Sequence, residues 1–150
     1  LLHNMKPIRP MTEEQAIQYL IMKDVPESVW RDWDKLLVND PKMVYVSSVN
    51  SGEIKGPHLH KKRISYFTCI HGKVVFILKK KDNSFVEIES SSENPILLKI
   101  PAGTPSAHIN ISNDVSRILT LADIAWKPND DEMDNVTFDD YDWKKWKLNE

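Results

Sequence analysis

The apolar residues between Met43 and Ile124 follow a period of two, which is the period of β-strands. Short apolar segments are separated by turn signals such as Ser51-Gly52 and His71-Gly72-Lys73, and no long helical pattern lies between them. This spacing predicts an antiparallel β-sandwich or barrel. The expected strands are a short one containing Val44 and Val46, then His58–Ile70, Val74–Leu78, Phe85–Ile88, Ile96–Ile100, Ala107–Ile111 and Ser116–Ile124.

Residues 12–38 carry a helical pattern instead. Thr12 and Gln15 have the spacing of a capping box, and an apolar stripe at helical spacing follows them. We therefore expect a short N-terminal helical segment that covers the barrel or contributes to an interface. Near the other end, the acidic stretch Asn129–Asp142 has the composition of a surface loop or tail, and the aromatic residues after it are expected to dock back.

The length of 150 residues is that of one domain. We predict a single domain, 1–150, with a helical cap over 12–38, a barrel over 43–125 and a C-terminal tail over 126–150. A formal net charge of −2 gives no reason to expect nucleic acid or an anionic membrane as a partner. No apolar run reaches the ~18–20 residues that span a bilayer. The single cysteine, Cys69, fits a reducing compartment, so the expected location is cytoplasmic.

His58 and His60 are the residues best suited to chemistry. Positions two apart in a strand point to the same face, so the two imidazoles project together. On the inner face of a small barrel, such a pair could bind a metal ion or transfer protons. We therefore place the candidate site on this strand.

Two segments resemble the motifs of the cupin family. Gly52…His58-Leu59-His60…Gly72 is similar to the first cupin motif, and Pro101-Ala102-Gly103…Asn110 is similar to the second. The resemblance implies an all-β cupin barrel, a jelly-roll-like double-stranded β-helix. Metal-dependent cupins add a glutamate and a second-motif histidine to the histidine pair, but this chain has Ile64 or Ser65 and Ser106 there. Because these side chains are poor metal ligands, no metal or other cofactor is expected.

The strand Lys55-Gly56-Pro57-His58-Leu59-His60-Lys61-Lys62 resembles more specifically the RmlC-like cupins, the superfamily of dTDP-4-dehydrorhamnose 3,5-epimerases and dTDP-sugar 3,4-ketoisomerases. The segment from Asp130 to Trp143 is similar to the epimerase tail. The resemblance implies an isomerase of a 4-keto-6-deoxy sugar nucleotide in deoxysugar or polysaccharide biosynthesis. That enzyme would be an epimerase or a ketoisomerase, working by metal-free general acid/base proton transfer. The resemblance also implies a homodimer.

The same resemblance implies roles for single residues. His58 is the candidate base, and His60 is its partner or a second proton carrier. Tyr45 stands near the position of the ketoisomerase acid, whereas Thr120 replaces the late-strand tyrosine of the epimerases. Lys55 stands where the family has an arginine that contacts the substrate.

Four further residues are expected to bind substrate. Lys62 and Arg63 could bind the diphosphate, although strand parity directs at most one of them inward. Tyr66 has the parity of the two histidines and could line the same cavity, or pack in the barrel. His108, two residues after Ser106, faces the same site or serves as a structural barrel residue.

Two other functions are compatible with the sequence. A non-catalytic sugar-binding cupin would explain why Lys55 replaces the arginine and why the late tyrosine is missing. A metal-dependent cupin enzyme would require a ligand set other than the usual four residues.

Overall fold

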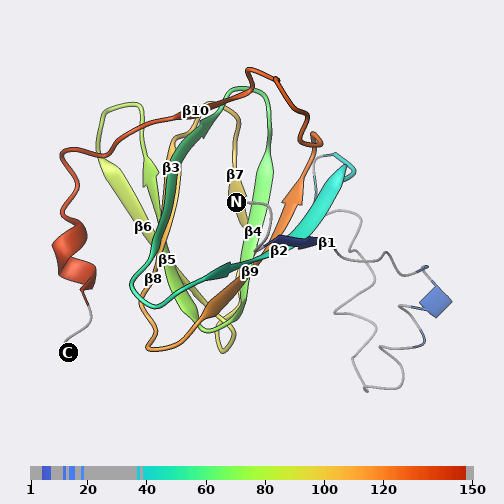
Figure 1. Ribbon diagram of the computed structural model, residues 1–150, viewed down its shortest axis with the longest axis horizontal. Helices are drawn as coiled ribbons and strands as arrows, with labels where there is room; N and C mark the ends of the chain where they lie inside the picture. Colours follow the sequence, from blue (N-terminus) through green and yellow to red (C-terminus); the bar gives the residue numbers. More distant parts are fainter. Residues whose placement is uncertain are drawn as a thin grey trace.

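The computed structural model describes residues 5–7, 12, 14–15, 18, 37 and 39–147. Their regular secondary structure is almost entirely β, as Figure 1 shows. The strands are β1 (Met5–Pro7), β2 (Met43–Val49), β3 (Ile54–His60), β4 (Ser65–His71), β5 (Lys73–Lys79), β6 (Phe85–Ser91), β7 (Leu98–Ile100), β8 (Ser106–Asn110), β9 (Ser116–Ala122) and β10 (Met133–Asn135), followed by the 3₁₀ helix η3 (Trp143–Trp146).

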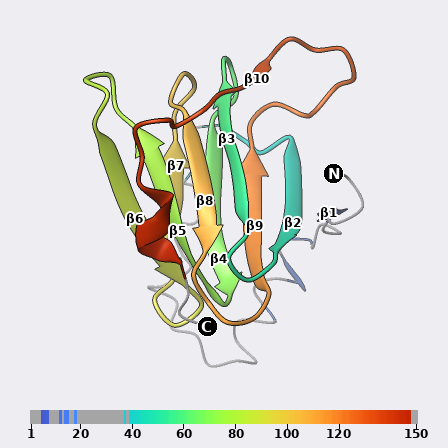
Figure 2. The same ribbon diagram turned by 60° about the vertical axis from the view of Figure 1, so that its left-hand side comes forward.

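The strands form two antiparallel five-stranded sheets that face each other (Figures 1 and 2). Sheet A has the order β1-β2-β9-β4-β7, and sheet B has the order β10-β3-β8-β5-β6. Consecutive strands alternate between the sheets from β2 to β5 and again from β6 to β10, which is the arrangement of a jelly roll. The predicted all-β cupin fold is confirmed.

The expected β5–β6 hairpin is present, with Val75 paired to Glu89 and Leu78 paired to Val86. The turn at Gly72 is also confirmed, because this glycine has φ = 82°. A Cβ atom at Gly72 would lie 2.2 Å from the Ser116 Oγ, so the turn has no room for a side chain. Between the sheets, the apolar side chains of Val49, Val74, Phe76 and Ile118 are almost completely buried.

The predicted long strand His58–Ile70 is wrong. The chain leaves sheet B after His60 and enters sheet A at Ser65. Between these two strands, the backbone is hydrogen-bonded to distant segments of the chain. The Lys61 N–H donates to the Glu132 carbonyl, and the Ile64 N–H donates to the Asp123 carboxylate. The parity of the histidine strand therefore does not continue into β4.

The C-terminal tail crosses the outer face of sheet B, as Figure 2 shows. Phe138 and Tyr141 are buried against Val75, Ile77 and Ile109 of that sheet. The Trp146 Nε1–H donates to the Tyr141 hydroxyl, which in turn donates to the Glu87 carboxylate. As expected, the aromatic residues of the tail dock on the barrel, with Trp143 and Trp146 packed beside this cluster.

The predicted helical cap over 12–38 lies largely outside the described residues, and the structure does not support it. The capping box at its start is present, since the Gln15 N–H donates to the Thr12 Oγ1 and the Thr12 N–H donates to the Gln15 Oε1. Among the described residues, no helix is long and apolar enough to cross a membrane.

Candidate active site

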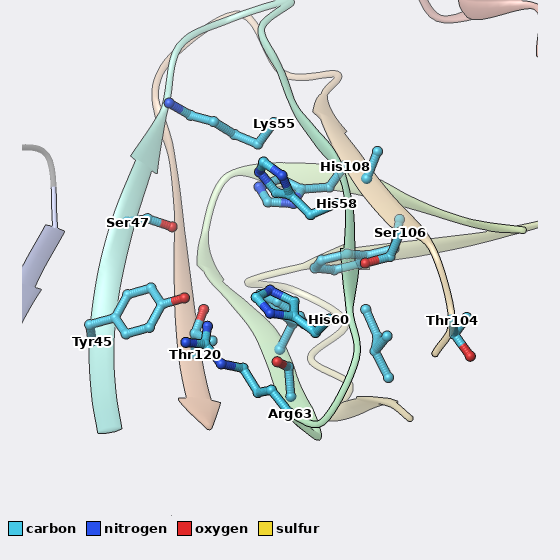
Figure 3. A pocket seen from close by; sticks show the side chains of 15 residues that line it. Tyr45, Ser47, Lys55, His58, His60, Arg63, Thr104, Ser106, His108 and Thr120 are labelled. Carbon is cyan, nitrogen blue, oxygen red and sulfur yellow. The ribbon is translucent and has the colours of Figure 1, made fainter. Parts of the chain in front are cut away.

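A cavity of about 160 Å³ lies between the two sheets (Figure 3). Both sheets supply polar side chains to it, and six of the residues expected from the sequence are among them. These residues are Tyr45, Lys55, His58, His60, Arg63 and His108.

The path of β3 explains why three of its side chains reach the cavity. His58 and His60 share a strand face, whereas Lys55, three residues before His58, would face away in a regular strand. The pairing of β3 with β8 shifts register between Lys55 and His58, and this bulge turns Lys55 inward as well. Gly56 lies in the bulge with φ = 87°, and a Cβ atom there would lie 3.0 Å from the Ser106 carbonyl oxygen. Lys55 also forms an ion pair with Glu53.

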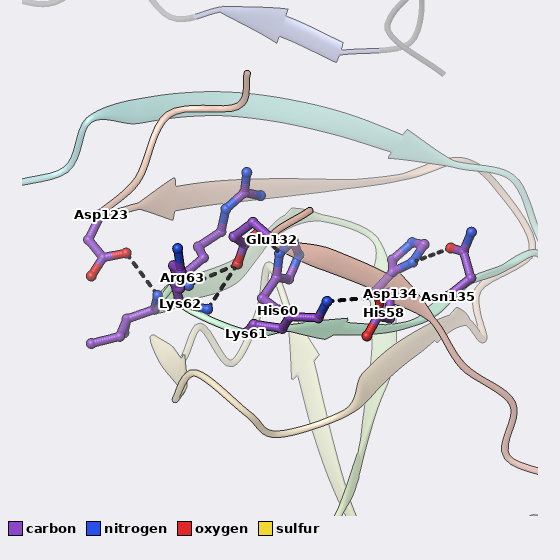
Figure 4. Close-up of polar contacts among 10 residues, drawn as sticks. His58, His60, Lys61, Lys62, Arg63, Asp123, Glu132, Asp134 and Asn135 are labelled. Carbon is purple, nitrogen blue, oxygen red and sulfur yellow. Dashed lines mark hydrogen bonds and ion pairs between the residues drawn. The ribbon is translucent and has the colours of Figure 1, made fainter. Parts of the chain in front are cut away.

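His58 is held as a neutral imidazole. Its Nδ1–H donates to the Asn135 Oδ1 at 3.1 Å, so Nε2 keeps its lone pair (Figure 4). Burial lowers the pKa of His58, and the neighbouring His60 acts in the same direction against the Asn135 contact. A neutral imidazole with a bare Nε2 is a proton acceptor at neutral pH.

His60 forms a dyad with Glu132. The His60 Nδ1 lies 2.8 Å from the Glu132 Oε2, and Glu132 is only 7% exposed (Figure 4). The other carboxylate oxygen, Oε1, accepts the backbone N–H groups of Lys62 and Arg63 at 3.3 and 2.9 Å. Although burial acts to raise it, these contacts and His60 hold the pKa of Glu132 below its usual value. The carboxylate fixes the tautomer and orientation of the His60 ring.

Tyr45 faces the histidines from the opposite sheet (Figure 3). It lies on β2 and is paired directly with Thr120 on β9. Burial raises the pKa of Tyr45, while the Arg63 guanidinium and the Thr120 hydroxyl act to lower it. The phenol therefore carries its proton at neutral pH and is available as an acid.

Three polar atoms in the cavity wall are buried without a hydrogen-bond partner, the Arg63 Nε, the His108 Nε2 and the Thr120 Oγ1. The His108 ring packs against Phe76 and Phe67, with ring centroids 5.3 and 6.3 Å away. Burial lowers the pKa of His108 to about 4, so this imidazole is neutral. Unpaired buried polar atoms in a cavity wall are typical of a ligand site.

Lys62 and Tyr66 do not line the cavity. Lys62 is exposed in the connection between β3 and β4. Tyr66 is 4% exposed, but its neighbours Ser65 and Phe67 are the residues of β4 that reach the cavity. Of the two alternatives left open for Tyr66, cavity lining required the parity of His58 and His60 to continue into β4, and the strand break between His60 and Ser65 interrupts that parity.

Sequence reasoning missed Glu132 and Asn135. Both belong to Asn129–Asp142, whose composition predicts a surface loop or tail, yet β10 pairs with β3 and places Asn135 opposite His58. The only signal was the resemblance of the Asp130–Trp143 segment to the epimerase tail. Its polar composition gives no strand pattern.

The donor set does not fit a divalent metal ion. Ser65 and Ser106 line the cavity at the positions where metal-dependent cupins have ligands. Within the part of the chain that the structure describes, no three His, Cys, Asp or Glu side chains gather closely enough to hold a metal.

Comparison with known families decides the relationship. Residues 22–143 match the family described as "FdtA: WxcM-like, C-terminal". The chain belongs to this family. The FdtA family is part of the RmlC-like cupin superfamily, as the histidine strand implied.

Solved structures show the same fold for this FdtA family member. The capsular polysaccharide assembling protein CapF from Staphylococcus aureus has a TM-score of 0.61 at 20% identity, over 66% of this chain and 29% of CapF. ChmJ, a 3'-monoepimerase from Streptomyces bikiniensis solved with dTDP-quinovose, has a TM-score of 0.57 at 16% identity. That match covers 65% of this chain and 52% of ChmJ, so the chain spans less than two thirds of either protein. No curated protein matches the chain in sequence.

Proposed function

We propose that this protein is an isomerase of a 4-keto-6-deoxy sugar nucleotide and that it acts as a 3,4-ketoisomerase. The observation that carries the proposal is that two groups face each other across the cavity. The His60–Glu132 dyad lies on one side, and the protonated Tyr45 lies on the other. Membership of the RmlC-like cupins and the structural likeness to ChmJ support a sugar nucleotide as substrate.

The first step is removal of the C3 proton next to the C4 carbonyl. The sequence favoured His58 as the base, but the contacts favour His60. Glu132 stabilises the imidazolium that forms on His60, whereas the Asn135 amide gives His58 no charged partner. Tyr45 donates its proton to the C4 oxygen as negative charge develops there.

The second step places a proton on C4. His58 accepts the proton of the C3 hydroxyl through its bare Nε2, and the protonated His60, whose N–H exchanges with solvent between the two steps, delivers a proton to C4. The product is the 3-keto sugar. Transfer of the proton from His58 to Tyr45, through solvent, restores both groups, so the reaction consumes no co-reactant.

Epimerisation at C3 is the second candidate, and one observation favours it. Tyr45 lies on the sheet opposite His60, which is where an acid must stand to protonate C3 from the other face of the sugar. The two reactions share the enolate and differ only in where the proton returns.

The size of the cavity supports separate binding places for the sugar and for the diphosphate of the substrate. At about 160 Å³ the cavity is smaller than the ~300 Å³ and more of sites for drug-sized ligands, so it holds the sugar alone. Thr104 lines both this cavity and a wider groove between the β5–β6 hairpin and the loop 101–105. Lys79, Lys80 and Lys81 line the groove, and we place the diphosphate there.

The test is proton exchange in D₂O with dTDP-4-keto-6-deoxyglucose, followed by NMR. The wild-type protein should lose the C3 proton signal and form a 3-keto product. His60→Gln should slow exchange on the order of 10²–10⁴-fold. His71→Gln is the matched control, because His71 is an exposed histidine outside the cavity. A protein that binds the sugar nucleotide but exchanges no proton would be the sugar-binding cupin instead.

A further inference from the structure

Arg63 is a buried arginine at the wall of the cavity. It lies in the connection between β3 and β4, where its backbone N–H donates to the Glu132 Oε1 at 2.9 Å. Its side chain is 7% exposed and lines the cavity together with Tyr45, His60 and Thr120 (Figure 3). The fold therefore holds this guanidinium beside the groups proposed to transfer protons.

The guanidinium has no counterion among the residues that the structure describes. Its Nε has no hydrogen-bond partner, and no carboxylate of the described residues forms an ion pair with it. Glu132 accepts the backbone N–H of Arg63, and its carboxylate is occupied by His60 and by two backbone N–H groups. A buried charge without a partner destabilises a fold. A positive charge kept at such a position is suited to an anionic ligand atom.

We infer that Arg63 is a catalytic residue that binds the enolate oxygen during proton transfer. The inference rests on the proposed function and deepens it. When the C3 proton leaves, the neutral C4 carbonyl oxygen gains negative charge, and a nearby guanidinium binds that oxygen more strongly than it binds the carbonyl. An interaction that strengthens in the transition state raises the rate of the chemical step.

The Arg63 charge also stabilises the deprotonated form of Tyr45. Once the phenol has donated its proton, the phenolate is negative, and Arg63 already acts on the Tyr45 hydroxyl in the direction that favours this state. A guanidinium has donors and no acceptor, so it supplies charge and hydrogen bonds while Tyr45 supplies the proton. Arg63 thus stabilises the negative charge on the C4 oxygen, and Tyr45 protonates the same oxygen.

This role differs from the diphosphate contact that the sequence suggested for Arg63. The guanidinium lines a cavity of about 160 Å³, which leaves no room for a diphosphate beside the sugar. The diphosphate is instead placed at the lysine-lined groove beyond Thr104.

The experiment compares Arg63→Met, Arg63→Lys and the control Arg117→Met, in which an exposed arginine of β9 is changed in the same way. Exchange of the C3 proton of dTDP-4-keto-6-deoxyglucose gives kcat and KM, and thermal unfolding gives Tm. Arg63→Met should lower kcat on the order of 10²–10³-fold, as loss of an oxyanion donor does, with a smaller change in KM. Its Tm should be equal to or above that of the wild type, because an unpaired buried charge is removed. Arg63→Lys should recover part of kcat.

Two results would overturn the inference. One is an Arg63→Met variant with unchanged kcat, and the other is a variant whose kcat falls together with a lowered Tm and is not improved by lysine. The second pattern would show that Arg63 holds the β3–β4 connection in place. If the wild-type protein itself exchanges no C3 proton, the proposed function fails first, and this outcome is distinct from a failure confined to Arg63→Met.

Discussion

The His60 Nδ1 lies 2.8 Å from the Glu132 Oε2, although the two residues are 72 positions apart in the chain. The contact joins a barrel strand to the C-terminal tail. It holds one ring nitrogen of His60 and leaves the other facing the cavity. The orientation of the histidine is therefore set by a segment none of whose described residues lines the cavity.

Glu132→Gln should slow C3 proton exchange on the order of 10²–10⁴-fold, because an amide can accept a hydrogen bond but cannot stabilise an imidazolium by charge. The measurement is exchange kinetics in D₂O across pH. Glu89→Gln is the control, since Glu89 is an exposed carboxylate of β6 that pairs with Lys73 on the surface. Full activity in Glu132→Gln would contradict the dyad.

Tyr45→Phe should remove the acid while it keeps the ring in the core. We expect product formation to fall on the order of 10²–10⁴-fold with little change in Tm. Tyr66→Phe serves as the comparison, because Tyr66 lies on the face of β4 that is turned away from the cavity. Equal losses in the two variants would mean that the phenol of Tyr45 has no special role.

Acid should destabilise the fold through His108. Burial lowers its pKa from 6.5 to about 4 in the folded protein, so between these values the unfolded chain binds a proton that the folded protein does not. Stability is thus lost as pH falls from about 6.5 to about 4, by about 3 kcal/mol at most. Lys55, His58 and Glu53 also act on His108, and the lowered pKa of His58 contributes with the same sign.

Urea unfolding at pH 7 and pH 4.5 checks this dependence. His108→Gln should lose a smaller part of its stability between the two pH values than the wild type does. An equal loss in both proteins would assign the acid sensitivity to other groups.

Reversing two charges in the groove should weaken nucleotide binding. Lys80 and Lys81 are exposed, line the groove and form no ion pair with another described residue. The double variant Lys80→Glu/Lys81→Glu should raise the Kd for dTDP at least about tenfold in calorimetry. Thymidine binding, which needs no phosphate contact, should change less.

The matched control for this experiment reverses Lys42 and Lys99, two exposed lysines outside the groove. The double variant Lys42→Glu/Lys99→Glu changes the net charge by the same amount. If both double variants weaken dTDP binding equally, the effect belongs to the overall charge, and the groove is not the diphosphate site.

Local patterns made much of the barrel predictable. The β5–β6 hairpin alternates apolar and polar residues around a polar loop, and the Gly72 turn requires a positive φ. The shared face of His58 and His60 follows from strand geometry alone. Each of these features is decided by residues that are close together in sequence.

The missing features depend on distant partners. Lys61–Ile64 contains no glycine or proline, so nothing local marks the end of β3, and the chain turns there because Glu132 and Asp123 accept its N–H groups. The strand Met133–Asn135 is short and lacks alternation, and its pairing with β3 decides its position. The same pairing creates the His60–Glu132 contact, which is why the site was predicted only in part.

The position of the tail outside the barrel determines how easily the candidate site is lost. The segment that orients both imidazoles continues into an aromatic strap on the outside of sheet B, whereas the histidines themselves lie within the barrel. Detachment of this strap from sheet B, or a proteolytic cut within it, would leave the barrel folded while the two imidazoles lost their partners on the tail. The proposed activity would then be lost before the fold is.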